Sequence, residues 1–466
     1  MSEKDDFDVL VIGAGPGGYA CAIRAAQLGL RTACADARET LGGTCLNVGC
    51  IPSKALLHAS HLYDQASGSG WERFGVRVGD LSFDLAAMMR GKDDTVETLT
   101  KGIDGLFRKN SVTRLKGLAR FAGRDRVDVA GRQLTARAIV IATGSVPGPL
   151  PGAEIEGGDG IVVDSTGALS LDRVPGRLAV IGGGAIGLEL GSVWRRLGAS
   201  VTVVEYMDRI LPGMDGDVGA AMAKILRRQG IDIRTSSRVK SIRSGNGEAR
   251  MAIEQAGKVE ELVADAVLVA TGRKPNTAGL GLAQAGLAVD EAGFIPVDRN
   301  MATAIPGIFA IGDVTRGPML AHRAEDEGIA VAERIAGRPG MVNHAVIPAI
   351  VYTDPEAAGV GRTEEELKRD GISYEKSSFP MSANSRARTN RELDGFVKIL
   401  ADAGTGEVLG AHIVSSLAGT MIGQVAQAME FGATAEDIAY SCHAHPTHNE
   451  AIKEAALGIS GRPIHI

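Results

Sequence analysis

Cysteine and aromatic residues are scarce in this chain. Its 466 residues include five cysteines, and aromatic side chains make up 4%. Five cysteines spread over such a length do not form the disulfide framework of a small secreted protein. We therefore expect any disulfide to be catalytic rather than structural, and the compartment to be a reducing one.

Long hydrophobic runs and an excess of basic residues are also missing. No run reaches the roughly 18 apolar residues of a membrane-spanning helix. The net charge of −6 argues against nucleic acid as the main partner. The first eight residues are charged and lead straight into a strand, so we expect no signal peptide. The length predicts about three domains.

A strand–turn–helix–strand pattern occurs twice. In the first copy, the apolar run 8–12 leads into the glycine motif GAGPGG, a helix follows over 19–29, and the next strand closes at Asp36. In the second copy, the run 178–181 leads into GGGAIG, and the next strand closes before Glu205. The spacing from the first glycine of the motif to the acid is the same in both copies.

This pattern is typical of dinucleotide-binding βαβ units. The first glycine makes the tight turn, the second lets the backbone approach a pyrophosphate, the third lets the helix pack on the strand, and the acid accepts from a ribose. Glycine-rich turns of ordinary βαβ units are the alternative interpretation. Two copies predict two different dinucleotides, and the related strands AIVIATGS (138–145) and AVLVATGR (266–273) support an internal duplication.

We therefore predict an α/β fold with two Rossmann-like dinucleotide-binding domains and a C-terminal α+β domain. The first dinucleotide domain would comprise residues 1–145 and 277–345, and the second would comprise 146–276. Residues 346–466 contain no phosphate-binding loop, and we expect them to form a dimer interface.

Cys45 and Cys50 carry the strongest chemical signal, in the motif GGTCLNVGCIPSK (42–54). They lie just before an expected helix, whose first turn suits Pro52. The helix dipole and Lys54, one turn further on, would stabilise a thiolate at Cys50, the reactive form in thiol–disulfide exchange. Two buried structural cysteines are the alternative. A zinc site would need ligands that the neighbouring sequence lacks.

His443, His445 and His448 are three of the nine histidines and lie close to Glu450. From the residues alone, a polar surface loop, a metal site and catalysis all stay open. An imidazole suits the role of a general base near neutral pH. Glu450 could orient the imidazole and stabilise its charged form.

The motif at 42–54 resembles the active-site segment of the flavin-dependent disulfide reductases, and the likeness extends over the whole chain. Within that family, the chain is most similar to the dihydrolipoamide dehydrogenases. Five segments carry this similarity: ETLGGTCLNVGCIPSKALL (39–57), VEYMDRILPGMD (204–215), GDVTRGPMLAHRAEDEG (312–328), FPMSANSRA (379–387) and SCHAHPTHNEA (441–451).

The resemblance implies FAD, one per subunit, and NAD as cofactors. In a redox-active disulfide, Cys45 would exchange with the substrate and Cys50 would lie next to the flavin. Lys54 would lie near flavin N5 and pair with Glu189. The FAD site would comprise Gly13, Gly15, Gly18, Asp36, Thr44, Lys54, Gly117, Thr143, Gly144, Asp313, Met319, Leu320 and Ala321. The NAD site would comprise Gly182, Gly184, Gly187, Glu205, Val239 and Gly272.

The resemblance also implies a homodimer with shared active sites, in which His445 of the other subunit is the base and Glu450 its partner. The substrate would be dihydrolipoamide on a lipoyl-bearing acyltransferase of a 2-oxo acid dehydrogenase complex or on a glycine cleavage protein. No nucleic acid, membrane or metal would take part. The compartment would be the bacterial cytoplasm, with the mitochondrial matrix as second choice.

Glu205 favours NAD over NADP, because a carboxylate there accepts from a free 2′-hydroxyl and repels a 2′-phosphate. An NAD-linked reductase of another small disulfide is the alternative enzyme, and a redox sensor without turnover is the non-enzymatic one. Three residues depart from the family's usual pattern: Asp36 replaces glutamate, Asp354 differs locally, and His448 stands where a small or apolar residue is usual. Their effects stay open at this point.

Overall fold

The computed structural model describes residues 6–67, 71–157 and 160–466. These residues form two compact units. The first unit comprises Met1–Leu56, Leu85–Gly148 and Gly272–Val342, and the second comprises Leu57–Asp84, Pro149–Thr271 and Asn343–Ile466. Among the described residues, no helix is both long and apolar enough to cross a membrane.

The first unit is built on a parallel sheet in the order β3-β2-β1-β6, with β18 beside β6. Two antiparallel strands, β5 and β4, continue from β6, and β7 pairs with β17 separately. The strands are β1 (Phe7–Ile12), β2 (Thr32–Asp36), β3 (Thr113–Lys116), β4 (Ala119–Phe121), β5 (Arg126–Val129), β6 (Arg132–Ile141), β7 (Ser145–Pro147), β17 (Arg273–Pro275) and β18 (Ile308–Ala310).

Both faces of this sheet are buried, which explains the apolar run 9–12 within β1. Because side chains alternate along a strand, Val9 and Val11 belong to one core cluster, which includes residues of the helices α1 and α8. Leu10 and Ile12 belong to the cluster on the opposite face, with residues of β4 and β5. The helices of this unit are α1 (Pro16–Gln27), α2 (Gly43–Val48), the start of α3 (Cys50–Ser67), α4 (Leu85–Lys109) and α8 (Ala321–Ile335).

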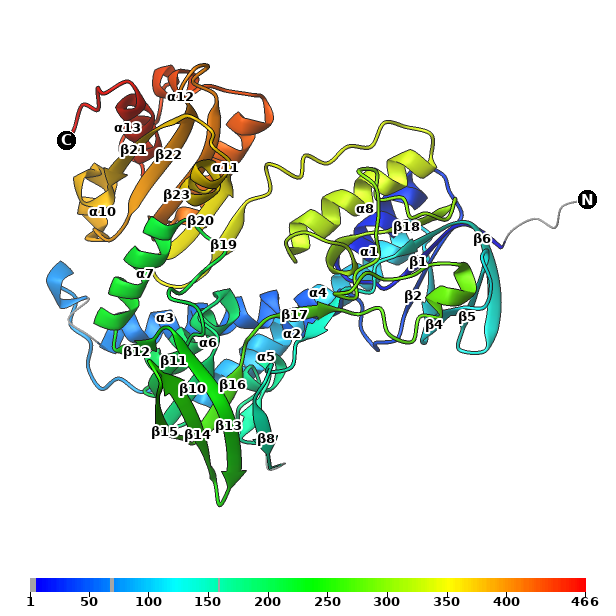
Figure 1. Ribbon diagram of the computed structural model, residues 1–466, viewed down its shortest axis with the longest axis horizontal. Helices are drawn as coiled ribbons and strands as arrows, with labels where there is room; N and C mark the ends of the chain where they lie inside the picture. Colours follow the sequence, from blue (N-terminus) through cyan, green and yellow to red (C-terminus); the bar gives the residue numbers. More distant parts are fainter. Residues whose placement is uncertain (1–5, 68–70, 158–159) are drawn as a thin grey trace, which may run out of the picture. The chain divides into compact units, whose positions relative to one another are not determined.

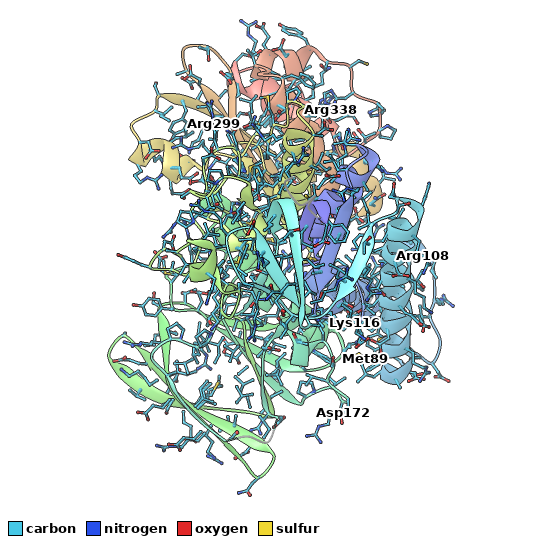
Figure 2. All side chains as sticks on the ribbon, turned by 90° about the vertical axis from the view of Figure 1, so that its right-hand side faces the viewer. Met89, Arg108, Lys116, Asp172, Arg299 and Arg338 are labelled. Atoms are coloured by element: carbon cyan, nitrogen blue, oxygen red, sulfur yellow. The ribbon has the colours of Figure 1, made fainter. Side chains whose placement is uncertain are left out.

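Helices α1 and α8 lie side by side (Figure 1). Glycines permit the close approach: a Cβ at Gly17 would lie 2.8 Å from Ala324 O, and one at Gly328 would lie 2.4 Å from Gly17 O. Helix α4, in contrast, has a narrow buried face formed by Lys92, Thr100 and Phe107. Figure 2 draws its side chains, with Met89 and Arg108 labelled near opposite ends of the helix.

The second unit repeats the parallel arrangement in the order β12-β11-β10-β16-β9. A second sheet, β15-β14-β13-β8, follows. The strands are β8 (Glu154–Glu156), β9 (Val162–Val163), β10 (Arg177–Ile181), β11 (Ser200–Val204), β12 (Ile231–Arg234), β13 (Ser237–Gly245), β14 (Glu248–Gln255), β15 (Lys258–Ala264) and β16 (Ala266–Val269), and the helices are α5 (Ser165–Ala168), α6 (Ala185–Arg196) and α7 (Gly216–Arg228).

The C-terminal part of this unit is an antiparallel sheet in the order β19-β20-β23-β22-β21, which shares one core with α11, α12 and α13. The strands are β19 (Ala349–Val351), β20 (Glu356–Gly361), β21 (Tyr374–Pro380), β22 (Phe396–Asp402) and β23 (Val408–Ser415). The helices are α9 (Glu364–Arg369), α10 (Ser385–Asn390), α11 (Ala418–Glu430), α12 (Ala435–Tyr440) and α13 (Glu450–Ile459).

A buried ion cluster joins this antiparallel sheet to α7. Lys398 on β22 lies 3.0 Å from Asp215, 2.6 Å from Asp217 and 2.6 Å from Glu364. Asp215 is also the N-cap of α7 and accepts from Asp217 N. Because a buried ammonium group requires carboxylate partners, this cluster ties the C-terminal sheet to the second parallel domain.

The predicted fold class is confirmed: two α/β dinucleotide-type domains are followed by an α+β C-terminal region. The predicted helix at 19–29 was placed too late, because α1 already begins at Pro16, directly after Gly15. Proline suits the first turn of a helix, where its missing N–H is not needed. The predicted domain boundaries stay a prediction.

Candidate active site

The two glycine turns have the same construction. Gly13 has φ +102° and Gly182 has φ +110°, and a Cβ at either would lie 2.4 Å from a carbonyl oxygen of the neighbouring strand end. A Cβ at Gly18 would lie 1.8 Å from Gly13 O, and one at Gly187 would lie 2.1 Å from Gly182 O. The first and third glycines of each motif are therefore required by the protein's own backbone.

The middle glycine of each motif is not required in this way. A Cβ at Gly15 would meet nothing closer than Gly43 Cα at 3.8 Å, and one at Gly184 would meet nothing within 4 Å. The space in front of these two glycines lies at a helix N-terminus, where a pyrophosphate is favoured. Both turns thus fit the dinucleotide that the sequence predicts for them.

The acid that follows each turn holds the turn in place. Asp36 Oδ2 accepts from Ala14 N at 2.6 Å, and Glu205 Oε2 accepts from Gly183 N at 2.6 Å. Asp36 thus makes the same backbone contact as Glu205 although its side chain is one methylene shorter. The ribose contacts of both acids stay predictions.

The other residues predicted for FAD lie around the carboxyl ends of the first parallel sheet. Gly117 N donates to Asp36 O at 2.9 Å, and Thr143 Oγ1 donates to Asn276 O at 2.7 Å. Gly144 O accepts from Asn276 N at 2.9 Å. Thr44 lies on α2, Met319 and Leu320 directly precede α8, and Ala321 is the first residue of α8.

Asp313 is held by two residues that the sequence analysis missed. Ser145 Oγ donates to Asp313 Oδ2 and accepts from Arg273 Nε at 2.7 Å. The turn before Asp313 is held in addition by Glu327, which accepts from Gly312 N at 2.7 Å and pairs with Arg323 at 2.8 Å. Both members of this ion pair are buried. No local motif could reveal the contacts of Ser145 with Asp313 and Arg273, because they connect separate strand ends, whereas Arg323 and Glu327 are one turn apart on α8.

Two of the residues predicted for NAD lie outside the second glycine motif in the chain. The side chain of Val239 is buried in a hydrophobic cluster. A β-bulge follows it, which interrupts the pairing of β13 with β14. Gly272 belongs to the first unit, where its carbonyl accepts from Gly148 N at 2.9 Å.

Cys45 and Cys50 lie on two successive helices. Cys45 is on the short helix α2, and Cys50 is the first residue of α3. The two sulfurs are present as thiols. A hydrogen bond with Cys50, together with burial, raises the pKa of the Cys45 thiol well above its ordinary value. Lys54 is on α3, four residues after Cys50, which places it on the same side of that helix.

Tyr19 and Glu325 form a pair near these cysteines that the sequence analysis did not identify. Tyr19 OH donates to Glu325 Oε1 at 2.6 Å. Burial and this hydrogen bond raise the pKa of the Tyr19 hydroxyl, and the charge of Glu325 contributes to the raised pKa of Cys45. The packing of α1 on α8 brings the pair together, which is why no local motif could reveal it.

His445 and Glu450 form a hydrogen-bonded pair in the second unit. His445 Nδ1 donates to Glu450 Oε1 at 2.9 Å, and Thr447 N donates to Glu450 Oε2 at 2.9 Å. Burial would raise the pKa of the Glu450 carboxyl, but the bonds from Thr447 and His445 outweigh burial and keep it below its ordinary value. Glu450 therefore stays ionised and orients an exposed imidazole.

Lys54 and Glu189 belong to different units, so their predicted pairing stays a prediction. Within the second unit, Glu189 is buried on α6, and its Oε1 accepts from Tyr352 N at 3.0 Å.

Comparison with known proteins decides the family. Residues 7–328 match the family described as pyridine nucleotide-disulphide oxidoreductase, and residues 347–456 match its dimerisation domain. The chain belongs to the pyridine nucleotide-disulphide oxidoreductases. The predicted enzyme class is thereby confirmed, and so is the presence of a dimerisation domain.

Members of this family from bacteria and eukaryotes resemble the chain over its full length. It is 53% identical to dihydrolipoyl dehydrogenase 3 of Pseudomonas aeruginosa, covering 98% of this chain and 99% of that one. It is 50% identical to mitochondrial dihydrolipoyl dehydrogenase of Dictyostelium discoideum, covering 98% and 95%. The resemblance to the dihydrolipoamide dehydrogenases is therefore confirmed.

A solved structure in the same family has a similar fold. The copper(II) complex of the HOCl-induced flavoprotein disulfide reductase RclA from Escherichia coli superposes with a TM-score of 0.86 at 29% identity, covering 97% of this chain and 99% of that one. The family uses a flavin and a pyridine nucleotide, which agrees with FAD and NAD as the predicted cofactors.

Proposed function

We propose that this oxidoreductase oxidises protein-bound dihydrolipoamide to lipoamide and reduces NAD+ to NADH through a redox disulfide between Cys45 and Cys50. The observation that carries the proposal is the hydrogen bond between the thiol of Cys45, on α2, and that of Cys50, at the start of α3. The full-length similarity to dihydrolipoyl dehydrogenases supports the choice of substrate.

The protein's side chains divide the work as follows. His445 removes a proton from one substrate thiol, while Glu450 holds Nδ1 and leaves Nε2 directed away from the carboxylate. The substrate thiolate attacks Cys45 Sγ, the Cys45–Cys50 bond breaks, and its electron pair stays on Cys50. The second substrate sulfur then displaces Cys45, which releases cyclic lipoamide and leaves two reduced cysteines.

Cys50 suits its role because it begins α3. The positive end of the helix dipole and the charge of Lys54 favour a thiolate at that position. Bound FAD supplies the two-electron chemistry that connects this dithiol with NAD+. In this scheme, Lys54 would lie near flavin N5 and would pair with Glu189.

We assign the first glycine turn to FAD and the second to NAD. FAD would be bound by Gly13, Gly15, Gly18, Asp36, Thr44, Gly117, Thr143, Gly144, Asp313, Met319, Leu320 and Ala321. NAD would be bound by Gly182, Gly184, Gly187, Glu205, Val239 and Gly272. The open space in front of Gly15 and Gly184 supports both assignments.

The functional unit in this proposal is a homodimer in which His445 of one subunit serves Cys45 of the other. The matched dimerisation domain supports the dimer. The partner would be a lipoyl-bearing acyltransferase or a glycine cleavage protein. We expect the bacterial cytoplasm as the location, with the mitochondrial matrix as second choice, because relatives of both kinds are known.

The test is an anaerobic titration of the purified flavoprotein with dihydrolipoamide, followed by addition of NAD+. Bleaching of the flavin absorbance by dihydrolipoamide, and NADH formation when NAD+ is added, would support the proposal. If dihydrolipoamide has no effect while NADH reduces the flavin and another small disulfide reoxidises it, the family assignment stands and the substrate assignment is wrong.

A further inference from the structure

His448 lies in the same loop as the pair formed by His445 and Glu450, but it is buried. Its Nε2 lies 3.3 Å from Glu392 Oε2, and its side chain is 5% exposed. Nε2 makes no hydrogen bond of good geometry among the described residues. Burying a polar imidazole costs free energy unless a partner offsets the cost, and Glu392 is the carboxylate within ion-pair distance of it.

Glu392 is itself held in place. It follows α10, and its Oε2 accepts from Ser416 Oγ at 2.7 Å and from Asn390 Nδ2 at 3.3 Å. Its backbone N donates to Ala387 O at 2.9 Å. His448 therefore pairs with a carboxylate, that of Glu392, which is hydrogen-bonded to the end of α10 and to the residue after β23.

The backbone next to His448 holds the carboxylate of Glu450. Thr447 N donates to Glu450 Oε2, and Thr447 O accepts from Asn384 Nδ2 at 3.0 Å. His448 O accepts from Ala451 N at 3.0 Å, in the first turn of α13. A displacement of the His448 side chain would therefore move Thr447 N, and with it the carboxylate that orients His445.

The third imidazole of the loop has a different anchor. Gln424 Nε2 donates to His443 Nε2 at 2.7 Å, and Asn449 Nδ2 donates to Gln424 Oε1 at 2.7 Å. The loop is thus attached to α11 through His443 and Asn449, and to the turn after α10 through His448. The second attachment is the one closest to Thr447.

We propose that His448, through its pairing with Glu392, is a positioning residue for the His445–Glu450 pair. The inference rests on the proposed function, in which His445 is the base. It extends that function to a residue that stands where the family usually has a small or apolar side chain. The carboxylate that pairs with His448 is that of Glu392, from the turn after α10.

The test compares His448→Leu, which removes the ring nitrogens, with His448→Gln, which keeps an amide near Nε2. We expect His448→Leu to lower kcat/KM for dihydrolipoamide about tenfold and to displace the pH profile, whereas His448→Gln stays within about threefold of wild type. Electron transfer from NADH to an artificial acceptor, which needs no base, should change by less than about twofold in both variants. Glu392→Gln should change kcat/KM for dihydrolipoamide and its pH profile in the same direction as His448→Leu.

A second measurement does not depend on the substrate. The rate at which diethyl pyrocarbonate modifies His445, followed by mass spectrometry between about pH 5 and 8, reports the protonation and exposure of that imidazole. His448→Leu should shift the pH dependence of this modification rate, and His58→Leu should not. The control variant removes an exposed histidine of α3, on an element separate from the His445 loop.

Two results would overturn the inference. One is a wild-type His445 modification profile together with wild-type kcat/KM in His448→Leu; the other is an equal loss in the leucine and glutamine variants, which indicates packing alone. If His448→Leu does not fold, the other two variants test the inference. Glu392→Gln should then shift the pH dependence of His445 modification, and His448→Gln should leave it unchanged. If the wild type does not oxidise dihydrolipoamide, the proposed function fails, and the His445 profile still tests the positioning role.

Discussion

The two compact units begin with the same element and carry different chemistry. Each has a parallel sheet whose first glycine turn is closed by an acid that accepts from the second residue of the motif. The first unit adds a thiol pair on α2 and at the start of α3, and the second adds a His–Glu pair in the loop before α13 and at its start. The shared element is determined by backbone sterics, whereas the chemistry is attached outside it at other helix ends.

The largest expected effect comes from removing the thiol pair of the first unit. Cys50→Ser should lower dihydrolipoamide oxidation by at least about a thousandfold, because no disulfide can form with Cys45. NADH-dependent reduction of an artificial acceptor should persist in the same variant. Both activities, dihydrolipoamide oxidation and NADH-dependent acceptor reduction, are measured on one preparation of the variant. Cys442→Ser changes an exposed cysteine outside the motif at 42–54 and serves as the matched control.

The second largest effect comes from removing the imidazole of His445 in the second unit. His445→Gln should lower kcat/KM for dihydrolipoamide by about a hundredfold to ten-thousandfold, since a general base contributes in that range. The acidic limb of the pH profile should flatten, and the activity with NADH and an artificial acceptor should remain. A variant with an unchanged pH profile would show that another group takes the proton.

The third effect sharpens the comparison of the two glycine turns. Gly184→Ala should fold and weaken NADH binding about tenfold, because the added Cβ enters open space that we assign to the nucleotide. Gly187→Ala places a Cβ 2.1 Å from Gly182 O and should lower the free energy of unfolding by about 1–3 kcal/mol. NADH titration by fluorescence and urea unfolding separate the two outcomes.

The smallest effect concerns the surroundings of the thiol pair. Glu325→Gln removes a negative charge that helps to raise the pKa of Cys45. A negative neighbour disfavours a thiolate, so the variant should have a lower Cys45 pKa and react with iodoacetamide about two- to fivefold faster at mildly alkaline pH. Peptide mapping of the reduced enzyme measures this rate. An unchanged rate would mean that Glu325 does not act on Cys45.

Much of the candidate site could be predicted because its parts are local. Cys45 and Cys50 are five positions apart on two successive helices, and His445 and Glu450 are five positions apart in a loop and at the start of α13. The glycine turns are equally local, since the first and third glycines meet each other's backbone. Even there, the start of α1 was misplaced, because Pro16 already belongs to the helix.

The sequence by itself determined the family, the fold class and the residues of these local motifs, because each motif depends on backbone geometry over a few residues. Only the tertiary structure decided which distant groups support them. Glu325 reaches Tyr19 through the packing of α8 on α1, and Lys398 reaches Asp215 across 183 positions of the chain. Glu392 reaches His448 in the same way. Such contacts depend on how elements pack and on which polar groups that packing buries, and neither is encoded in the spacing of residues along the chain.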